Sequence, residues 1–426
     1  MCQTTPLLSA AVNSNTFLRV AYTEVRFRSF AGGKKMSEEG RKEVILEMTA
    51  DHLNSGLRGV PVGTCRTSYV TPTGGVHYCG YPIAELADRD PEDILFLLHY
   101  KSLPSPSESS AFRDDLARRA ILPQGVRDTL RGLPKDGHPM DWLAIGIQAL
   151  GMTGRIDEWR EDALNLVARM PELMALIFRI RDDREEGMPN SRPELGMVEN
   201  FVHLVDIEGA DKWAMTRVLR VFLVLHMDHG GGNLSTFTGK AIASGHADVY
   251  ASMSGAMNAL YGPLHGRANQ SCLEFVQRIG TSDADAVEKF VRAELAAKRP
   301  IFGFGHAVLQ AEDPRAAIQF GLGAEICPDD ENFRTIRTLR QVAPKVLGEI
   351  PKIRNPNANV DIASGTLLHH VGFTDTAYYT TFFGWARTAG IGAQIVDERM
   401  VMRDGKGVPL YRPKYIPEQQ QEQHID

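Results

Sequence analysis

The chain has 426 residues, of which 43% are hydrophobic and 23% are charged, the ordinary balance of a soluble globular protein. This length accommodates two domains, or one large domain with a substantial insert. The net charge of -6 is spread without a run of like charges, so the composition gives no support to a nucleic-acid partner. An anionic substrate therefore needs a locally basic pocket.

The chain contains five cysteines, none of them in a CxxC pair, and no stretch resembles a secretory signal peptide. We therefore expect free thiols in a reducing compartment. No apolar run reaches the roughly 18 residues that a membrane span requires, so no membrane partner is expected.

The first 35 residues hold three arginines and two lysines against the single acid Glu24. That composition suits a mitochondrial transit peptide, whereas an over-long gene start would place the true beginning at Met36. In either case we expect residues 1–35 to lie outside the folded core. The expected location is cytoplasmic, or the mitochondrial matrix if this segment is a transit peptide.

Residues 63–81 show the pattern of a β-hairpin, and helical patterns dominate after residue 90. Asp90 followed by Pro91 is typical of a helix start. Pro171 predicts a kink or break within a long helix. The predicted helices cover residues 91–103, 142–152, 156–180, 248–260, 283–298, 333–350 and 376–400. The fold class is therefore mainly α, with a small β-hairpin near the N-terminus.

The predicted helix at 248–260 carries many small side chains, which allow another helix to approach closely. It is a tightly packed core helix, a subunit-interface helix, or both. Elsewhere, the glycines of GFG at 303–305 lack the third glycine of a dinucleotide-binding fingerprint, and no GxxxxGK(S/T) loop occurs. A nucleotide-binding α/β domain is therefore not expected.

Three stretches each set an ionisable side chain among small, turn-forming residues. They are GPLHGRANQ with His265, GFGHAVLQAEDPR with His306 and Arg315, and NPNANVDIASGTLL with Asp361. One carboxylate and two imidazoles can take a proton from a weak carbon acid, hold the enol and direct it at a carbonyl. Taken singly, Asp361 is also explained as a helix cap, and His265 as a buried structural histidine.

Together with DHGGGN at 228–233 and FFGWAR ending in Arg387, these stretches resemble the citrate synthase family over about residues 57–413. The resemblance implies a citrate synthase-like two-domain helical fold, hinged over a cleft. The implied parts are an N-terminal extension at 1–35, a large helical domain at 36–267, a small acyl-CoA domain at 268–366, and a return to the large domain at 367–426.

The resemblance also assigns three catalytic roles. Asp361 matches the base that removes a methyl proton from acetyl-CoA. His265 matches a neutral histidine that donates an N–H group to the thioester oxygen, because an unprotonated imidazole can still serve as an electrophile. His306 matches the histidine that polarises and protonates the carbonyl of oxaloacetate.

Substrate carboxylates need cations, and the planar fork of arginine suits them. The resemblance gives this role to Arg315 and Arg387, and to Arg412 supplied by the neighbouring subunit of a homodimer. His229 matches a further oxaloacetate-binding histidine. His226 and His229 have the i, i+3 spacing of a metal pair, but no acid or thiol completes a known zinc pattern, so no metal is expected.

Coenzyme A is expected along the small domain, as part of a co-substrate and not as a permanently bound cofactor. Gln310 stands where many members of the family carry an arginine, which removes one phosphate contact. The residues expected to contact coenzyme A are Gly303, Phe304, Gly305, Lys352 and Arg354.

The implied function is that of a citrate (Si)-synthase, an acyltransferase of the tricarboxylic acid cycle. The nearest alternative is a 2-methylcitrate synthase that uses propionyl-CoA, because one methylene contributes only about 1–3 kcal/mol of discrimination. A catalytically silent structural paralogue is a remote alternative, since the three candidate catalytic residues are all present.

Overall fold

The computed structural model describes residues 44–306 and 308–416. The chain divides into two compact units, one ending at Val62 and the other beginning at Gly63. In the first unit, the described residues contain the short 3-10 helix η1 (Ala50–Asn54). The extension predicted at 1–35, whether transit peptide or over-long gene start, lies outside the described residues.

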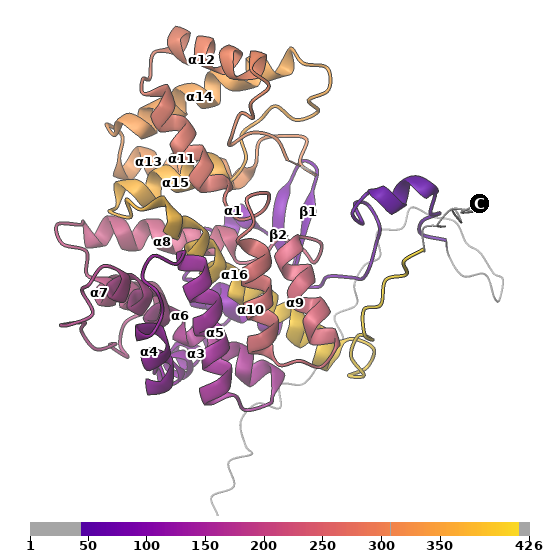
Figure 1. Ribbon diagram of the computed structural model, residues 1–426, viewed down its shortest axis with the longest axis vertical. Helices are drawn as coiled ribbons and strands as arrows, with labels where there is room; N and C mark the ends of the chain where they lie inside the picture. The colour runs from indigo at the N-terminus through magenta and orange to yellow at the C-terminus, as the bar shows by residue number, and fades with distance from the viewer. Residues whose placement is uncertain (1–43, 307, 417–426) are drawn as a thin grey trace, which may run out of the picture. The chain divides into compact units, whose positions relative to one another are not determined.

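The second unit is mostly helical, as predicted, and carries a small antiparallel sheet (Figure 1). Strands β1 (Ser68–Thr71), β2 (Gly75–Tyr78) and β3 (Tyr81–Pro82) follow one another in the order β1-β2-β3. The turn between β1 and β2 ends at Gly75, which has φ +77. A Cβ there would lie 2.7 Å from Pro314, so only glycine fits without a shift. The hairpin predicted at 63–81 is confirmed.

One group of helices forms the larger part of this unit. It comprises α1 (Ile83–Leu86), α2 (Pro91–Tyr100), α3 (Pro106–Arg119), α4 (Gln124–Arg131), α5 (Pro139–Gly154), α6 (Trp159–Arg181), α7 (Met197–Val205), α8 (Lys212–His226), α9 (Leu234–Ser244), α10 (Val249–Leu260), η2 (Thr376–Tyr378), α16 (Tyr379–Val396) and the π-helical turn η3 (Asp397–Val401). Helix α16 is buried along nearly its whole length and packs against α2, α6, α8, α9 and α10. It is therefore the central helix of the group.

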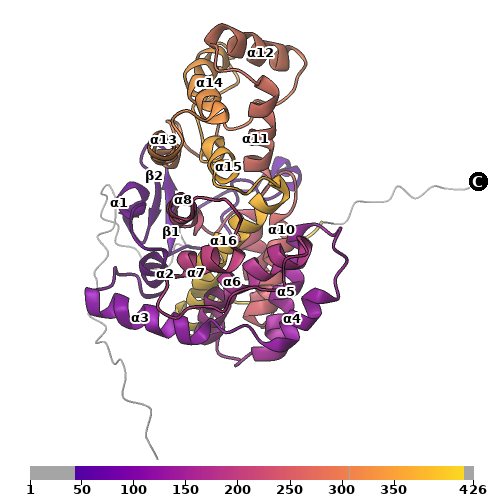
Figure 2. The same cartoon turned by 90° about the vertical axis from the view of Figure 1, so that its left-hand side faces the viewer.

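A second group lies together at one end of the unit in both ribbon views (Figures 1 and 2). It comprises α11 (Ala268–Ile279), α12 (Ala284–Ala296), α13 (Pro314–Ile326), α14 (Glu331–Gly348) and α15 (Asp361–His370). Helix α11 packs against α15, α12 packs against α14, and α8 of the first group contacts both α13 and α15. The domain boundaries predicted from the sequence remain predictions.

Most helix ends agree with the sequence patterns. As predicted, Asp90 is the N-cap of α2 and Pro91 is its first residue, although the Asp90 carboxylate pairs with Arg113 and Arg220 and not with the backbone of the helix. Helix α6 continues through Pro171, so the break allowed by the sequence does not occur, while the alternative of a kink stays a prediction. Burial of α6 on both sides of this proline holds the helix together against the lost hydrogen bond.

The small side chains of α10 serve close helix packing. A Cβ on Gly255 would come within 2.2 Å of Ile242 Cδ1 on α9. The prediction that α10 is a tightly packed core helix is therefore confirmed. Within the described ranges, none of the helices combines the length and apolar character needed to cross a membrane.

Candidate active site

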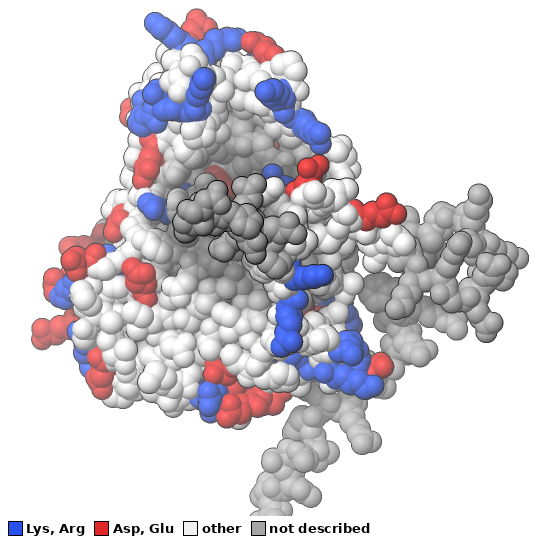
Figure 3. Space-filling view, turned by 45° about the vertical axis from the view of Figure 1, so that its right-hand side comes forward, with Lys and Arg blue, Asp and Glu red and all other residues white. Residues whose placement is uncertain are grey.

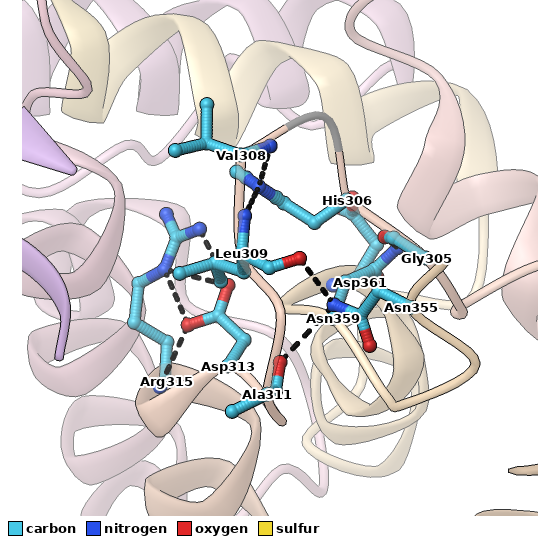
Figure 4. Close-up of polar contacts among 10 residues, drawn as sticks. All are labelled: Gly305, His306, Val308, Leu309, Ala311, Asp313, Arg315, Asn355, Asn359 and Asp361. Atoms are coloured by element: carbon cyan, nitrogen blue, oxygen red, sulfur yellow. Dashed lines mark hydrogen bonds and ion pairs between the residues drawn. The ribbon is translucent and has the colours of Figure 1, made fainter. Parts of the chain in front are cut away.

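Two loops of the α11–α15 region are joined by backbone pairing. The first, 303–313, contains His306, and the second, 351–360, ends at α15. Phe304 forms an isolated antiparallel bridge with Ala358. The Asn359 side chain adds a hydrogen bond of 3.0 Å to a carbonyl of the first loop (Figure 4). This pairing holds the two motif stretches next to each other.

Gly303 allows the first loop to lie close against helices α11 and α15. It has φ +84, and a Cβ there would lie 3.0 Å from both Cys272 Sγ on α11 and Ile362 Cα on α15. A glycine at 303 is therefore explained by the packing of this loop on the two helices. The predicted contact of this segment with coenzyme A remains a prediction.

His306 is half-buried, and its Nδ1 accepts the backbone N–H groups of Val308 and Leu309, both at 3.0 Å (Figure 4). Burial and the nearby Arg315 lower the pKa of the imidazole, so the ring is neutral at pH 7. A neutral imidazole that accepts at Nδ1 carries its proton on Nε2. His306 therefore offers an Nε2–H donor.

His265 lies in the turn that follows α10 and is also half-buried. Its Nε2 accepts the backbone N–H of Ser235 at 3.2 Å and lies 2.9 Å from the Ser235 hydroxyl. Burial, with a smaller contribution from Arg387, lowers the pKa of this ring to about 4. The neutral ring therefore carries its proton on Nδ1, the opposite tautomer from His306.

Asp361 is the first residue of α15, and its backbone N–H is bound by the Asn359 side chain at 3.0 Å. The N-cap is Val360, so Asp361 is not the helix cap that the sequence allowed as an alternative. Burial raises the pKa of its carboxyl to about 6, against the opposing effect of Arg315 and Arg387. Asp361 is therefore ionised at neutral pH and more basic than an ordinary aspartate.

Arg315 is buried in a bidentate pair with Asp313, at 2.7 Å between Nη2 and Oδ2 and 3.0 Å between Nε and Oδ1. Burial favours the neutral carboxyl, but the guanidinium outweighs it and holds the pKa of Asp313 below its usual value. No sequence pattern marks Asp313 as a site residue. The pair fixes the Arg315 side chain beside the His306 loop (Figure 4).

Arg387, in the middle of α16, is 3% exposed. Among the described residues, its Nε and Nη1 have no hydrogen-bond partner. The guanidinium lies over the ring of Phe383 at 4.7 Å, and burial lowers its pKa to about 10. A buried cation with free donors is a suitable partner for a carboxylate ligand.

Ring contacts join several of these residues. The His265 ring lies 6.4 Å from the ring of Phe383, over which the Arg387 guanidinium also lies. Arg315 and Arg387 both oppose the raised pKa of Asp361, and Arg387 contributes to the lowered pKa of His265. The ring of His229 lies 5.4 Å from the ring of His306, and its pKa is lowered well below the usual value by burial and by the same two arginines. The predicted site residues brought together are His229, His265, His306, Arg315, Asp361 and Arg387.

Three predicted residues lie apart from this group. Arg412 is exposed on the C-terminal segment, and no hydrogen bond or ion pair among the described residues joins it to the site. Lys352 and Arg354 are exposed on the second loop, before the buried Asn355.

Asp228, which precedes His229, is fully buried and was not among the predicted site residues. Its Oδ1 accepts the His229 backbone N–H at 2.9 Å and Gln394 Nε2 at 2.8 Å. Its Oδ2 accepts the Thr67 hydroxyl. The DHGGGN motif pointed to Asp228, but the sequence carries no signal for Thr67 or Gln394, which come from distant elements.

His226, the second member of the possible metal pair, is a core residue. It is 1% exposed, its Nδ1 is bound by the Phe222 carbonyl at 2.8 Å, and it stacks on the Phe222 ring. In the described parts of the chain, no group of three histidine, cysteine, aspartate or glutamate side chains is arranged to hold a metal ion.

Comparison with known proteins places the chain in a family. The family model described as "Citrate synthase, C-terminal domain" matches residues 56–414. Citrate synthase 4, mitochondrial, of Arabidopsis thaliana is 33% identical over 412 residues, which cover 90% of this chain and 85% of the relative. A 2-methylcitrate synthase, mitochondrial, of Yarrowia lipolytica is 32% identical over 412 residues, covering 89% and 87%.

A solved structure agrees with these sequence matches. The crystal structure of citrate synthase from Thermotoga maritima superimposes with a TM-score of 0.74 at 31% identity, covering 87% of this chain and 97% of that one. With the family model matching most of the chain, the protein belongs to the citrate synthase family of acyltransferase enzymes.

Proposed function

We propose that this enzyme condenses acetyl-CoA with oxaloacetate and water to give citrate and coenzyme A. The observation that carries this proposal is a pair of neutral histidines in opposite tautomers beside a carboxylate of raised pKa. His265 offers Nδ1–H and His306 offers Nε2–H, while Asp361 is a base of pKa about 6. Forming and using an enol requires one base and two separate hydrogen-bond donors.

In the proposed reaction, the Asp361 carboxylate takes a proton from the methyl group of acetyl-CoA. The His265 Nδ1–H stabilises the negative charge that develops on the thioester oxygen. The new carbon nucleophile attacks the oxaloacetate carbonyl, whose oxygen receives a proton from His306 Nε2. Water then attacks the thioester of citryl-CoA, the C–S bond breaks, and coenzyme A leaves as the thiol with a proton from that water. The proton held by Asp361 restores the one that His306 gave up, so both residues return to their starting states.

The proposed anchors for oxaloacetate are Arg315, Arg387 and His229. The buried Nε and Nη1 of Arg387 have no partner in the described part of the chain, and Arg315 is fixed by Asp313 beside His306. Fixed guanidinium groups bind carboxylates with little loss of side-chain freedom. Burial, with the positive charge of Arg315, lowers the pKa of both His229 and His306, and a neutral ring suits hydrogen-bond donation to a carbonyl.

The acyl donor is tested by coenzyme A release from purified protein with oxaloacetate and either acetyl-CoA or propionyl-CoA. We expect acetyl-CoA to be preferred, and Asp361→Asn to lower turnover by about 10² or more. A preference for propionyl-CoA would establish a 2-methylcitrate synthase, a possibility that the Yarrowia relative keeps open. No turnover with either donor from a folded protein would indicate a silent paralogue.

We also infer that the α11–α15 group forms the small lobe and closes over coenzyme A. The residues proposed to contact coenzyme A are Gly303, Phe304, Gly305, Lys352 and Arg354. The last two are exposed cations on the loop that leads to Asp361, and exposed cations remain available to phosphates. Closure would exclude water until citryl-CoA has formed.

A homodimer is part of the proposal. A groove of about 400 Å³ lies between α5 and α10, and its walls include Ile145 and Met152. These apolar side chains are 40% and 81% exposed, which is unfavourable in a monomer. In the view of Figure 3, the lower part of the unit shows a broad area with few charged side chains. A second copy of the chain is the proposed occupant.

Under this proposal, Arg412 enters the active site of the neighbouring subunit. Mixed dimers of Arg412→Ala and Asp361→Asn chains test it, since each parent homodimer should be nearly inactive. If Arg412 acts across the interface, the mixed dimer regains one intact site and measurable activity. If it acts within its own subunit, both sites stay damaged and mixing restores nothing.

The location is tested by fluorescent fusions of the full chain and of a chain that starts at Met36. We expect cytoplasmic fluorescence for the shorter fusion. The relatives named mitochondrial support the matrix as the alternative for the full chain, whereas a further relative is named peroxisomal.

A further inference from the structure

A series of buried polar side chains runs from the DHGGGN turn to the C-terminal segment. At the turn, the Asp228 carboxylate accepts the His229 backbone N–H at 2.9 Å and Gln394 Nε2 at 2.8 Å. At the far end, the Tyr411 hydroxyl donates to Glu398 Oε1 at 3.2 Å. The series therefore has a carboxylate at each end, that of Asp228 at the turn and that of Glu398 beside the C-terminal segment.

Lys240 of α9 connects these two ends. Its Nζ donates to Gln394 Oε1 at 3.4 Å and pairs with Glu398 Oε1 at 2.8 Å. The exposed fractions of Lys240, Gln394 and Glu398 are 4%, 3% and 3%. A Cβ on Gly231 would lie 2.8 Å from Lys240 Nζ, so the DHGGGN turn packs directly on this side chain.

The π-helical turn η3 directs Glu398 inward and holds the C-terminal segment at the same place. The Glu398 carbonyl accepts the Val408 backbone N–H at 2.9 Å, and Arg399 donates to the Val408 carbonyl. Single π-helical turns often occur where a helix must aim side chains for a function. Here three successive charged residues point into the protein, which a surface helix end does not need.

A buried ion pair is an inefficient source of stability, because desolvation of both charges offsets their attraction. It does specify which elements meet, since either partner alone would be left as an uncompensated charge. The Lys240–Glu398 pair is therefore better explained by positioning than by stability. None of these side chains belongs to the proposed catalytic or substrate-binding set.

We propose that this buried polar chain positions the His229 turn and the Arg412-bearing segment relative to each other. Its members are Asp228, Gln394, Lys240, Glu398 and Tyr411. The inference rests on the proposed function, in which His229 and Arg412 both bind oxaloacetate. Because Arg412 serves the neighbouring subunit under that proposal, the chain connects the two active sites of the dimer.

The first test is Lys240→Met, which breaks the chain at its centre. We expect the KM for oxaloacetate to rise about tenfold, with kcat and the KM for acetyl-CoA within about twofold of wild type. Lys240→Arg, which keeps the charge and both contacts, should retain most of the wild-type KM. The matched control is Lys289→Met, an exposed lysine on α12, which should change none of these values.

The second test separates positioning from stability. Lys240→Met leaves Glu398 as an unpaired buried charge and should lower the Tm, whereas Lys240→Met/Glu398→Leu removes both charges and should restore it. The double variant still lacks the link, so its KM for oxaloacetate should stay raised. Recovery of the KM together with the Tm would overturn the proposal, and so would a wild-type KM in Lys240→Met.

Failure of the proposed function would be seen separately. If wild-type protein does not condense oxaloacetate with either acyl-CoA, the proposed function is wrong and this inference falls with it. If wild type is active and the variants keep its KM, only the positioning role is wrong.

Discussion

The turn that carries His265 and the loop that carries His306 fix a neutral histidine in similar ways but with opposite results. His306 accepts backbone N–H groups at Nδ1 from Val308 and Leu309, two and three residues along the same loop. His265 accepts one at Nε2 from Ser235, which lies 30 residues earlier at the start of α9. The tautomer of His306 is therefore determined by a short stretch of sequence. That of His265 depends on how the turn after α10 packs against the start of α9.

This difference teaches that a histidine in a glycine-rich motif does not reveal which nitrogen will donate. Backbone amides are strong donors that cannot be removed by rotating a side chain, so they select the tautomer with little freedom. Two histidines of one active site can thus serve two different steps, His265 at the enol and His306 at the carbonyl.

The largest expected effect separates those two steps. His265→Ala should lower two rates by about 10² or more each: the rate of condensation and the rate at which the methyl protons of acetyl-CoA exchange with solvent. His306→Ala should lower condensation by a similar factor but retain exchange in the presence of a carbonyl-free dicarboxylate. Exchange is followed by NMR in deuterated buffer.

Loss of exchange in both variants would contradict the division of roles between the two histidines, because it would mean that both act on the enol. Thermal unfolding of each variant, measured beside wild type, controls for loss of fold.

The pH profile gives the next largest effect. Asp361 must be unprotonated to act as the base, and its raised pKa of about 6 lies above the value of about 4 for His265. The kcat/KM for acetyl-CoA should therefore fall about tenfold per pH unit below pH 6, with one proton taken up.

This acid limb should remain in Ser235→Ala, because it belongs to the carboxylate. An acid limb near pH 7 that moves when either histidine is altered would show that a histidine titrates, against the neutral state inferred for both rings.

A moderate effect is expected from Ser235→Ala. The substitution removes the hydroxyl that lies 2.9 Å from His265 Nε2 but leaves the backbone N–H donor. We expect kcat to fall about tenfold with little change in the KM for oxaloacetate. The matched control is Ser107→Ala, which alters an exposed serine of α3. An equal loss of kcat in that variant would show that Ser235 does not position His265.

The smallest expected effect is in the His306 loop. Gln310 is exposed, and its backbone N–H donates to the Pro72 carbonyl at 2.8 Å, a bond that a change of the side chain leaves in place. Gln310→Arg should lower the KM for acetyl-CoA by about three- to tenfold by adding a phosphate contact. Gln310→Glu, of the same shape but opposite charge, should raise it, and equal values for the two variants would rule out a phosphate nearby.

Features that depend on neighbours along the chain were predictable from the sequence. The start of α12 at Asp283, whose side chain accepts the Ala286 N–H at 2.9 Å, follows from local capping rules. The helical fold class, the hairpin and the motif residues follow from equally local patterns. The three catalytic candidates were found because each sits in a distinctive stretch.

Features that depend on distant neighbours were not predictable. Asp228 contacts Thr67 and Gln394, which lie 161 and 166 residues away. No local pattern marks those partners, since a threonine and a glutamine occur at many ordinary positions. The unbroken course of α6 through Pro171 has the same origin, because surrounding helices and not local propensity decide it.

The buried pair of Lys240 and Glu398 also has an evolutionary consequence. A single substitution at either position leaves a charge inside the protein, whereas a joint replacement by two apolar residues does not. Selection should therefore act on the two positions jointly. We expect that across the family the lysine and the glutamate are retained together or replaced together. A lineage that had lost only one of them would need a new partner within a few ångströms, and such a chain would be the natural variant from which to learn what the pair contributes.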